Sequence, residues 1–169
     1  MNVHVMSRFE AIEFNKISFK NPYVIISIND TNQSNPDFRF GKSGLVSVSY
    51  HYFDDVEIGE KNCITKLEAR QIADFVTLNI PIGVEDIVVH CEGGISRSAG
   101  CAAALMKYFN NDDPPIFNNP KYTPNMTVYR FVLEALMNID MGDEEQKEIT
   151  IKFKKNKDIY KHYFDLHNS

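Results

Sequence analysis

Apolar residues along the chain form short runs typical of strands and longer runs with helical spacing. The segments Tyr23–Ile28 (YVIISI) and Asp86–His90 (DIVVH) are apolar and β-branched, which predicts two buried strands. In Leu45–Phe53 (LVSVSYHYF) apolar and polar residues alternate, which predicts a strand with one wetter face. The apolar face of that strand would carry Val46, Val48, Tyr50 and Tyr52, and the wetter face Ser47, Ser49 and His51.

Three other segments repeat their apolar residues at helical spacing. Thr65 and Glu68 form a capping box before one of them, and Pro81 follows its last apolar position, so we predict a helix over Lys66–Asn79. A second predicted helix, Arg97–Phe109, is rich in small residues that let a helix lie close to a sheet. A third, amphipathic helix is indicated by Val128, Phe131, Val132, Ala135, Leu136 and Ile139.

The alternation of strands and helices predicts an α/β fold, with a mostly parallel central sheet between helical layers. The 169 residues include 43% hydrophobic ones, which is enough for one core, so we expect a single domain over residues 1–169. Asp143 with Gln146 is typical of the cap of a final helix. The lysine-rich and aromatic stretch over about 143–169 has no role that the sequence assigns.

Charge and cysteine content narrow the class of protein. A net charge of -5 and a pI of about 5.5 argue against binding to nucleic acid or to an anionic membrane, so we expect neither partner. An odd number of cysteines and no signal-like apolar segment favour a soluble protein of the reducing cytoplasm. Cys63, Cys91 and Cys101 are then free thiols, and no Cys-x2-Cys or His-x3-His spacing occurs, so we expect neither a metal nor another cofactor.

One short segment, VVHCEGGISRSAG at residues 88–100, combines several reactive residue types between a predicted strand and a predicted helix. In an open α/β sheet, ligands bind where a strand ends and the chain turns into a helix. Cys91 lies at that point. Gly93 and Gly94 can adopt backbone angles that aim N–H groups inward, and the helix dipole adds to the attraction of an anion. The predicted phosphate-binding residues are Glu92, Gly93, Gly94, Ile95, Ser96 and Arg97.

The same setting activates a cysteine. Backbone amides, a helix N-terminus and a guanidinium lower a cysteine pKa from about 8.5 to roughly 3.5–7.5. Arg97 could hold two phosphoryl oxygens with its planar fork as charge shifts in the transition state. Ser98 is placed to donate its hydroxyl to the sulfur, which would ease departure of the thiolate from a phosphocysteine. The alternatives are a buried structural thiol at Cys91 and simple helix capping by Ser98.

The strand-Cys-x5-Arg-helix arrangement, with the segment HCEGGISRSA, resembles the signature of the cysteine-dependent protein tyrosine phosphatases, especially the dual-specificity branch. The N-terminal segments MSRFEA and YVIISIND are similar to the opening of small bacterial and phage-type members. Together the matches run from residue 7 to about 136. They imply a dual-specificity-phosphatase-like fold, hydrolysis of phosphotyrosine and phosphoserine or phosphothreonine, and a loop-orienting role for His90.

The resemblance also implies a general acid on a loop upstream of the signature. The segment YHYFDDVE ends a predicted strand about 36 residues before Cys91 and offers Asp54 and Asp55. In dual-specificity members the acid often follows an acidic or small residue, so we predict Asp55 and keep Asp54 as the alternative.

A second local match, YTPNMTVYRFVLEAL at residues 122–136, is similar to the Ser-Pro-Asn segment that opens a later helix in these phosphatases. Thr123 replaces the serine. The asparagine of that segment helps to hold the signature loop, which implies this supporting role for Asn125.

Two other functions stay open at this point. One is hydrolysis of a phosphoinositide or an RNA 5'-triphosphate, although lipid-directed relatives carry lysines within the loop, where this chain has EGGIS. The other is a phosphate-binding interaction module without turnover, against which the intact cysteine, arginine and acidic pair argue. The leading expectation is a metal-independent phosphatase that acts on a phosphorylated protein or another phosphate monoester.

Overall fold

A parallel sheet forms the centre of the molecule. In the computed structural model, which describes residues 1–17, 19–41 and 43–139, four strands pair in the order β1-β4-β2-β3. They are β1 (Asn2–Ser7), β2 (Tyr23–Asn29), β3 (Leu45–Tyr52) and β4 (Asp86–Cys91). The three predicted strands are confirmed to within a residue at their ends. Strand β1 is an addition, since its short NVHVMS run alternates too briefly to stand out.

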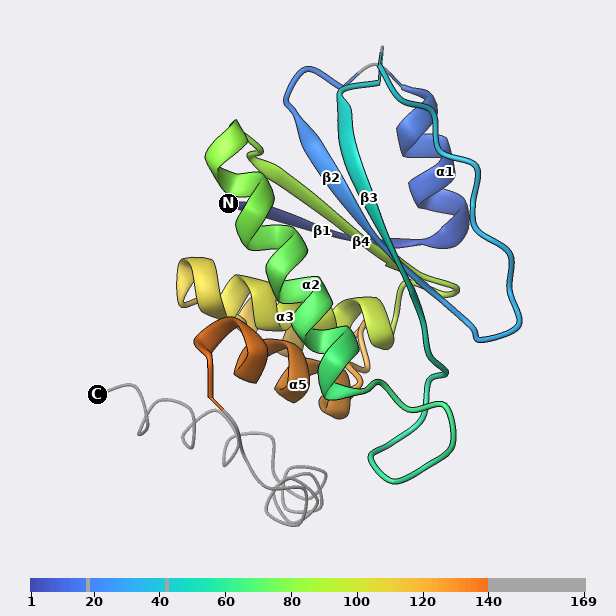
Figure 1. Cartoon of the computed structure of the whole chain (residues 1–169), viewed down its shortest axis with the longest axis vertical. Helices are drawn as coiled ribbons and strands as arrows, with labels where there is room; N and C mark the ends of the chain where they lie inside the picture. The colour runs from blue at the N-terminus through green and yellow to red at the C-terminus, as the bar shows by residue number, and fades with distance from the viewer. Residues whose placement is uncertain (18, 42, 140–169) are drawn as a thin grey trace. The chain divides into compact units, whose positions relative to one another are not determined.

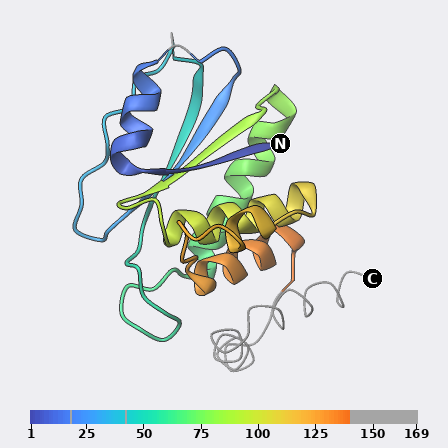
Figure 2. The ribbon, with the colours of Figure 1, turned by 180° about the vertical axis from the view of Figure 1, so that it is seen from behind.

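Helices cover both faces of this sheet. Figures 1 and 2 show α1 on one face and α2, α3 and α5 on the other. The helices are α1 (Arg8–Lys16), α2 (Lys66–Asn79), η1 (Ile80–Ile82), α3 (Arg97–Asn110), α4 (Pro114–Phe117) and α5 (Met126–Met137). The predicted α/β fold, with a parallel sheet between helical layers, is therefore confirmed. Within the described residues, no helix has both the length and the apolar character that crossing a bilayer requires.

Residues Met1–Asn138 make up one compact unit. Strand β2 is buried at every residue, as its uninterrupted apolar run predicts. On the α1 face, Tyr23 and Ile25 of this strand pack in one cluster with Ala11 and Phe38. The predicted cap at Asp143 and Gln146, and the stretch from about 143, lie outside the described residues.

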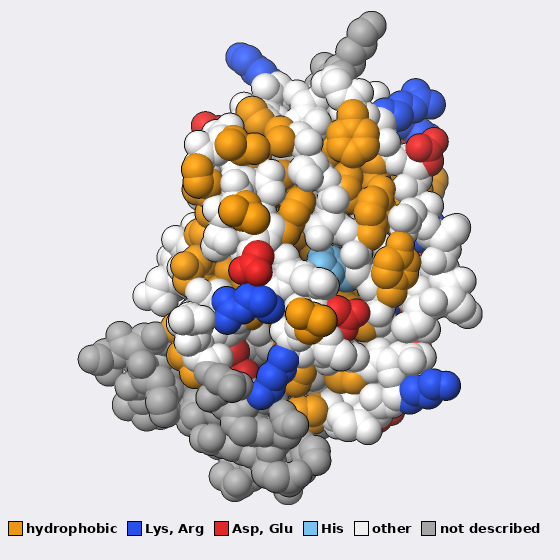
Figure 3. Space-filling model, in the orientation of Figure 1, with side chains coloured by type: hydrophobic (Ala, Val, Ile, Leu, Met, Phe, Trp, Pro, Cys, Tyr) orange, Lys and Arg blue, Asp and Glu red, His pale blue; other side chains and the backbone are white. Residues whose placement is uncertain are grey.

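Edge strand β3 departs from the predicted alternation at three positions, one of which is Tyr52, predicted on the apolar face but 39% exposed. Tyr23 pairs with Leu45 and Val24 with Ser47, so Val46 sits at a bulge and is 40% exposed. His51, predicted on the wetter face, is buried because that face lies under α2, and its Nε2 atom is 2.8 Å from Ser49 Oγ. Figure 3 shows hydrophobic side chains exposed on the part of the molecule that contains β3.

Local signals place the starts of two helices. The Thr65 hydroxyl accepts a hydrogen bond from the Glu68 amide, and the Glu68 carboxylate accepts one from the Thr65 amide, which confirms the predicted capping box of α2. The same reciprocal pair, Ser7 with Glu10, begins α1.

Helix α5 differs from its prediction in two ways. It ends at Met137, because Asn138 adopts a left-handed conformation with φ of 58°, and Ile139 lies beyond the helix. It is also buried along its length rather than on one face. Its polar residues Arg130 and Glu134 are buried together, 3.9 Å apart between Nε and Oε1.

Helix α3 packs closely against the start of α5. A Cβ at Gly100 would lie 2.4 Å from the Asn125 carbonyl oxygen. The Asn125 amide in turn donates to the Ser96 carbonyl, 3.1 Å away. The small residues that follow Arg97 therefore allow the N-termini of α3 and α5 to be joined directly.

Substitution Gly100→Ala tests this close approach. Alanine in an open helix interior stabilises by about 1 kcal/mol relative to glycine. Here the added methyl would push α3 away from Asn125, and overpacking of this kind costs about 1–3 kcal/mol. We expect a lower midpoint in urea and a lower Tm. A more stable variant would contradict the packing described.

Candidate active site

The signature loop joins the end of β4 to the start of α3, as predicted. Gly94 has a φ of 66°, and a Cβ there would lie 2.5 Å from the Ser7 amide nitrogen. The Arg8 amide donates to the Glu92 carbonyl at 3.2 Å. The loop is therefore folded against the junction of β1 and α1. Gly93 has no such constraint, since a Cβ there would meet only the Ile95 side chain, at 3.8 Å.

Cys91 and Ser98 lie together beneath this loop. Cys91 is 3% exposed, Ser98 is fully buried, and their Sγ and Oγ atoms are 3.1 Å apart. The structure thus places the serine hydroxyl at the sulfur, where the signature predicts it. Because the first turn of a helix has N–H groups without intrahelical partners, these two residues also sit next to a source of positive potential.

Ser96 occupies the N-cap position of α3 but its side chain makes no capping hydrogen bond. Its hydroxyl instead donates to Asp55 Oδ1 at 2.8 Å. The amides of the first turn therefore have no side-chain cap, which leaves them available to an anionic ligand.

Arg97 is 4% exposed, and one of its nitrogens has two partners in the described residues. The Nη1 atom donates to the Phe53 carbonyl at 2.7 Å and pairs with Asp30 Oδ1 at 2.6 Å. Its buried Nε–H has no hydrogen-bond partner within the described part of the chain. A buried N–H without a hydrogen-bond partner lowers the stability of the fold, which indicates that a bound ligand accepts a hydrogen bond from Arg97 Nε.

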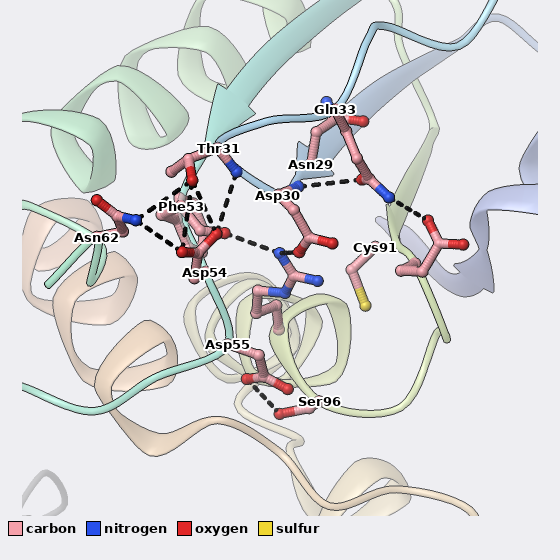
Figure 4. A network of polar contacts seen from close by, with 12 residues as sticks. Asn29, Asp30, Thr31, Gln33, Phe53, Asp54, Asp55, Asn62, Cys91 and Ser96 are labelled. Atoms are coloured by element: carbon pink, nitrogen blue, oxygen red, sulfur yellow. Dashed lines mark hydrogen bonds and ion pairs between the residues drawn. The ribbon is translucent and has the colours of Figure 1, made fainter. Parts of the chain in front are cut away.

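The two candidate acids have different surroundings, and Figure 4 shows Asp54 beside Thr31 and Asn62 and Asp55 beside Ser96. Hydrogen bonds from the Asn62 side chain and the Thr31 amide lower the pKa of Asp54. Of the two aspartates, Asp55 is the one that the structure connects to the signature loop.

Asn125 connects the start of α5 to both loops of the site. Its amide donates to the Ser96 carbonyl, while its side-chain Nδ2 donates to Asp55 Oδ1 at 2.8 Å and to the Val56 carbonyl at 3.1 Å. Its Oδ1 accepts the Val128 amide as the N-cap of α5. The structure thus brings Asn125 to the signature loop, as the resemblance implies, and also to the candidate acid.

His90 lies fully buried behind the loop. Its Nε2 atom is 2.8 Å from Ser27 Oγ, and its Nδ1 atom is 3.5 Å from the Cys91 carbonyl oxygen. Burial lowers the pKa of His90 to about 4. The ring is therefore neutral at neutral pH and connects the end of β4 to β2, in keeping with an orienting role.

The outer side of the loop carries Glu92 and Ile95. Glu92 Oε2 accepts from Gln33 Nε2 at 2.9 Å, and Ile95 is 44% exposed. Gln33 and Asp30, which both reach the site, come from the segment that follows β2. Neither residue is among the predicted site residues. The sequence signal that could have identified this segment is its run of acidic and amide residues directly after a buried strand. Neighbouring parallel strands end at the same edge of a sheet, so residues that follow β2 lie near those that follow β4.

The other two thiols differ from Cys91. Burial raises the pKa of Cys63 to about 11, with Glu60, Glu68 and Glu57 adding to the shift. Cys101 is fully buried, and burial, then the nearby Cys91, raises its pKa as well. Both pKa shifts disfavour the nucleophilic thiolate, so neither thiol is a candidate nucleophile. In the described residues, no group of three or more potential ligands is arranged to hold a metal ion.

Comparison with known proteins relates this arrangement to solved structures. No family model matches the chain, and no curated protein matches it in sequence. Human DUSP28 superposes with a TM-score of 0.56 at 13% identity, over 80% of this chain and 92% of that one. A mouse putative dual specificity phosphatase complexed with zinc tungstate gives 0.55 at 13% identity, over 80% and 82%. Tk-PTP in its active form gives 0.51 at 13%, over 82% and 92%. The dual-specificity-phosphatase-like fold is therefore confirmed.

The buried His90 predicts a loss of stability in acid. The unfolded chain takes up a proton near pH 6.5 and the folded state only near pH 4, so stability falls as the pH drops through that window. Because of this histidine, the free energy of unfolding should be about 2 kcal/mol lower at pH 5 than at pH 7. In His90→Gln, urea unfolding should show a correspondingly shallower decline. His51→Gln should act in the same direction, since burial lowers its pKa to about 4 too. A decline unchanged in both variants would contradict this assignment.

Proposed function

We propose that this protein is a cysteine-dependent phosphatase that hydrolyses phosphate monoesters through a phosphocysteine intermediate. The observation that carries the proposal is the 3.1 Å contact between Cys91 Sγ and Ser98 Oγ at the start of α3. The adjacent Arg97 has partners on Nη1 but none on its buried Nε within the described residues. A purely structural role for Cys91 would not explain why the Ser98 hydroxyl, an uncapped helix N-terminus and the unpaired Nε–H of Arg97 surround it.

The first step transfers the phosphoryl group to sulfur. The Cys91 thiolate attacks phosphorus while the bond to the leaving oxygen breaks, and Asp55 gives that oxygen its proton. The backbone amides of residues 92–97 and the guanidinium of Arg97 stabilise the charge on the phosphoryl oxygens. Hydrogen bonds from the Ser96 and Asn125 side chains hold Asp55 beside the signature loop, which supports this role.

The second step releases phosphate. The Asp55 carboxylate takes a proton from water, the water oxygen attacks phosphorus, and the sulfur–phosphorus bond breaks. The departing thiolate receives the hydrogen bond of the Ser98 hydroxyl. The aspartate is again protonated, so the enzyme returns to its starting state.

The substrates that we propose are phosphotyrosine and phosphoserine or phosphothreonine of proteins. The outer side of the loop carries the acidic Glu92 and the exposed, apolar Ile95, a surface suited to a peptide side chain. A phosphoinositide or an RNA 5'-triphosphate carries several phosphates and would favour extra cations there. The remaining alternative is a phosphate-binding module without turnover.

Turnover of p-nitrophenyl phosphate in the presence of a metal chelator tests the mechanism. In Cys91→Ser we expect kcat to fall by about 10³-fold or more, because the hydroxyl is a far weaker nucleophile than the thiolate. Cys63→Ser is the matched control and should retain activity, since that thiol lies outside the site. Full activity of Cys91→Ser would overturn the mechanism, and phosphopeptide binding without turnover by the unaltered protein would favour the module.

A pair of aspartate substitutions tests the general acid. In Asp55→Asn we expect kcat/KM for phenyl phosphate to fall by about 10²-fold or more, and that for p-nitrophenyl phosphate to fall less, because nitrophenolate leaves without a proton. Asp54→Asn should have a smaller effect that is equal for the two substrates. The opposite ranking of the variants would assign the acid to Asp54.

A further inference from the structure

Asp30 lies outside the signature and contacts its arginine. It follows the last residue of β2, and its Oδ1 is 2.6 Å from Arg97 Nη1. Figure 4 shows Asp30, Cys91 and Asp55 arranged around the centre of the site. Asp30 is about one-third exposed, whereas the arginine side chain is almost wholly buried.

The position of this contact on the guanidinium determines which edge of it is left for a ligand. The Nη1 atom is held from two directions, by Asp30 Oδ1 and by the Phe53 carbonyl at the end of β3. The Nε–H on the opposite edge is buried without a partner in the described residues. A guanidinium grips phosphate through two parallel N–H groups. With Nη1 anchored, the edge formed by Nε and Nη2 is the one that remains for that grip.

The segment that carries Asp30 is itself fixed in place. The Asp30 amide donates to Gln33 Oε1 at 3.1 Å, and the Gln33 amide donates to the Asp30 carbonyl at 3.0 Å. The neighbouring Asn29 accepts from Arg8 Nη1 at 2.8 Å, and Thr31 donates to Asp54. The residues on both sides of Asp30 thus form hydrogen bonds, Asn29 with α1 and Thr31 with the loop after β3, and these contacts fix the position of the Asp30 carboxylate.

We propose that Asp30 is a positioning residue that turns the Nε–Nη2 edge of Arg97 toward the phosphoryl group. The inference rests on the proposed function of the site. Asp30 touches neither substrate nor sulfur, and its effect passes through Arg97. Its hydrogen-bond acceptor matters more than its charge, because a negative charge this close to the phosphate repels it.

The test measures kcat/KM for p-nitrophenyl phosphate and the inhibition constant of inorganic phosphate. Asp30→Ala removes the acceptor, and we expect kcat/KM to fall by about 10-fold or more and phosphate to bind correspondingly more weakly, the size expected for a lost hydrogen bond to a charged group. Asp30→Asn retains an acceptor oxygen and should stay closer to the unaltered protein. The matched control is Asp37→Ala, an exposed acidic residue of the same connection, which should change neither constant.

A double-mutant cycle separates positioning from a general structural effect. In the Arg97→Lys background, Asp30→Ala should produce little further loss of phosphate binding, measured by calorimetry, because the fork that it orients is gone. Equal losses in both backgrounds would overturn the proposal, and so would an unchanged or improved kcat/KM in Asp30→Ala. Absence of turnover in the unaltered protein would refute the proposed function, whereas phosphate binding would still test the effect of Asp30 on Arg97.

Discussion

The buried guanidinium of Arg97 is the charge around which the site is built. A cation removed from water is tolerated only when carboxylates or carbonyls replace its hydration, and a single nitrogen here accounts for two of these contacts. The Asp30 carboxylate follows the end of β2, and the Phe53 carbonyl follows the end of β3. Because both contact Arg97, this one side chain connects two loops to α3. Since β2 and β3 are neighbours in the sheet, both loops leave it at the edge where β4 delivers Cys91.

The features that could be predicted from sequence are those set by local chemistry. The Thr65 and Glu68 pair marks the start of α2, the unbroken apolar run marks the buried β2, and the Cys-x5-Arg spacing places the loop between β4 and α3. Helix α5 could be predicted from its apolar spacing, although not its end at Met137. These signals work because the residues that determine the structure lie within a few positions of one another.

Features that depend on distant partners could not be predicted in this way. Val46 is exposed because of the register between β2 and β3, and His51 is buried because α2 crosses that face. Asp54 and Asp55 are adjacent in sequence, yet the first bonds to Thr31 and Asn62 and the second to Ser96 and Asn125. Their partners come from segments that are distant in sequence, and the spacing of the two aspartates contains no information about those partners.

The contact between Gly94 and the backbone of Ser7 gives the first strand a second purpose. A Cβ at Gly94 would lie only 2.5 Å from the Ser7 amide nitrogen, so the signature loop packs directly against the backbone at the end of β1. The Arg8 amide completes the support by donating to Glu92. The chemistry of residues 91–97 is thus coupled to the first eight residues of the chain, far from it in sequence. For protein engineering, a substitution in residues 2–8 is therefore also a change to the support of the signature loop.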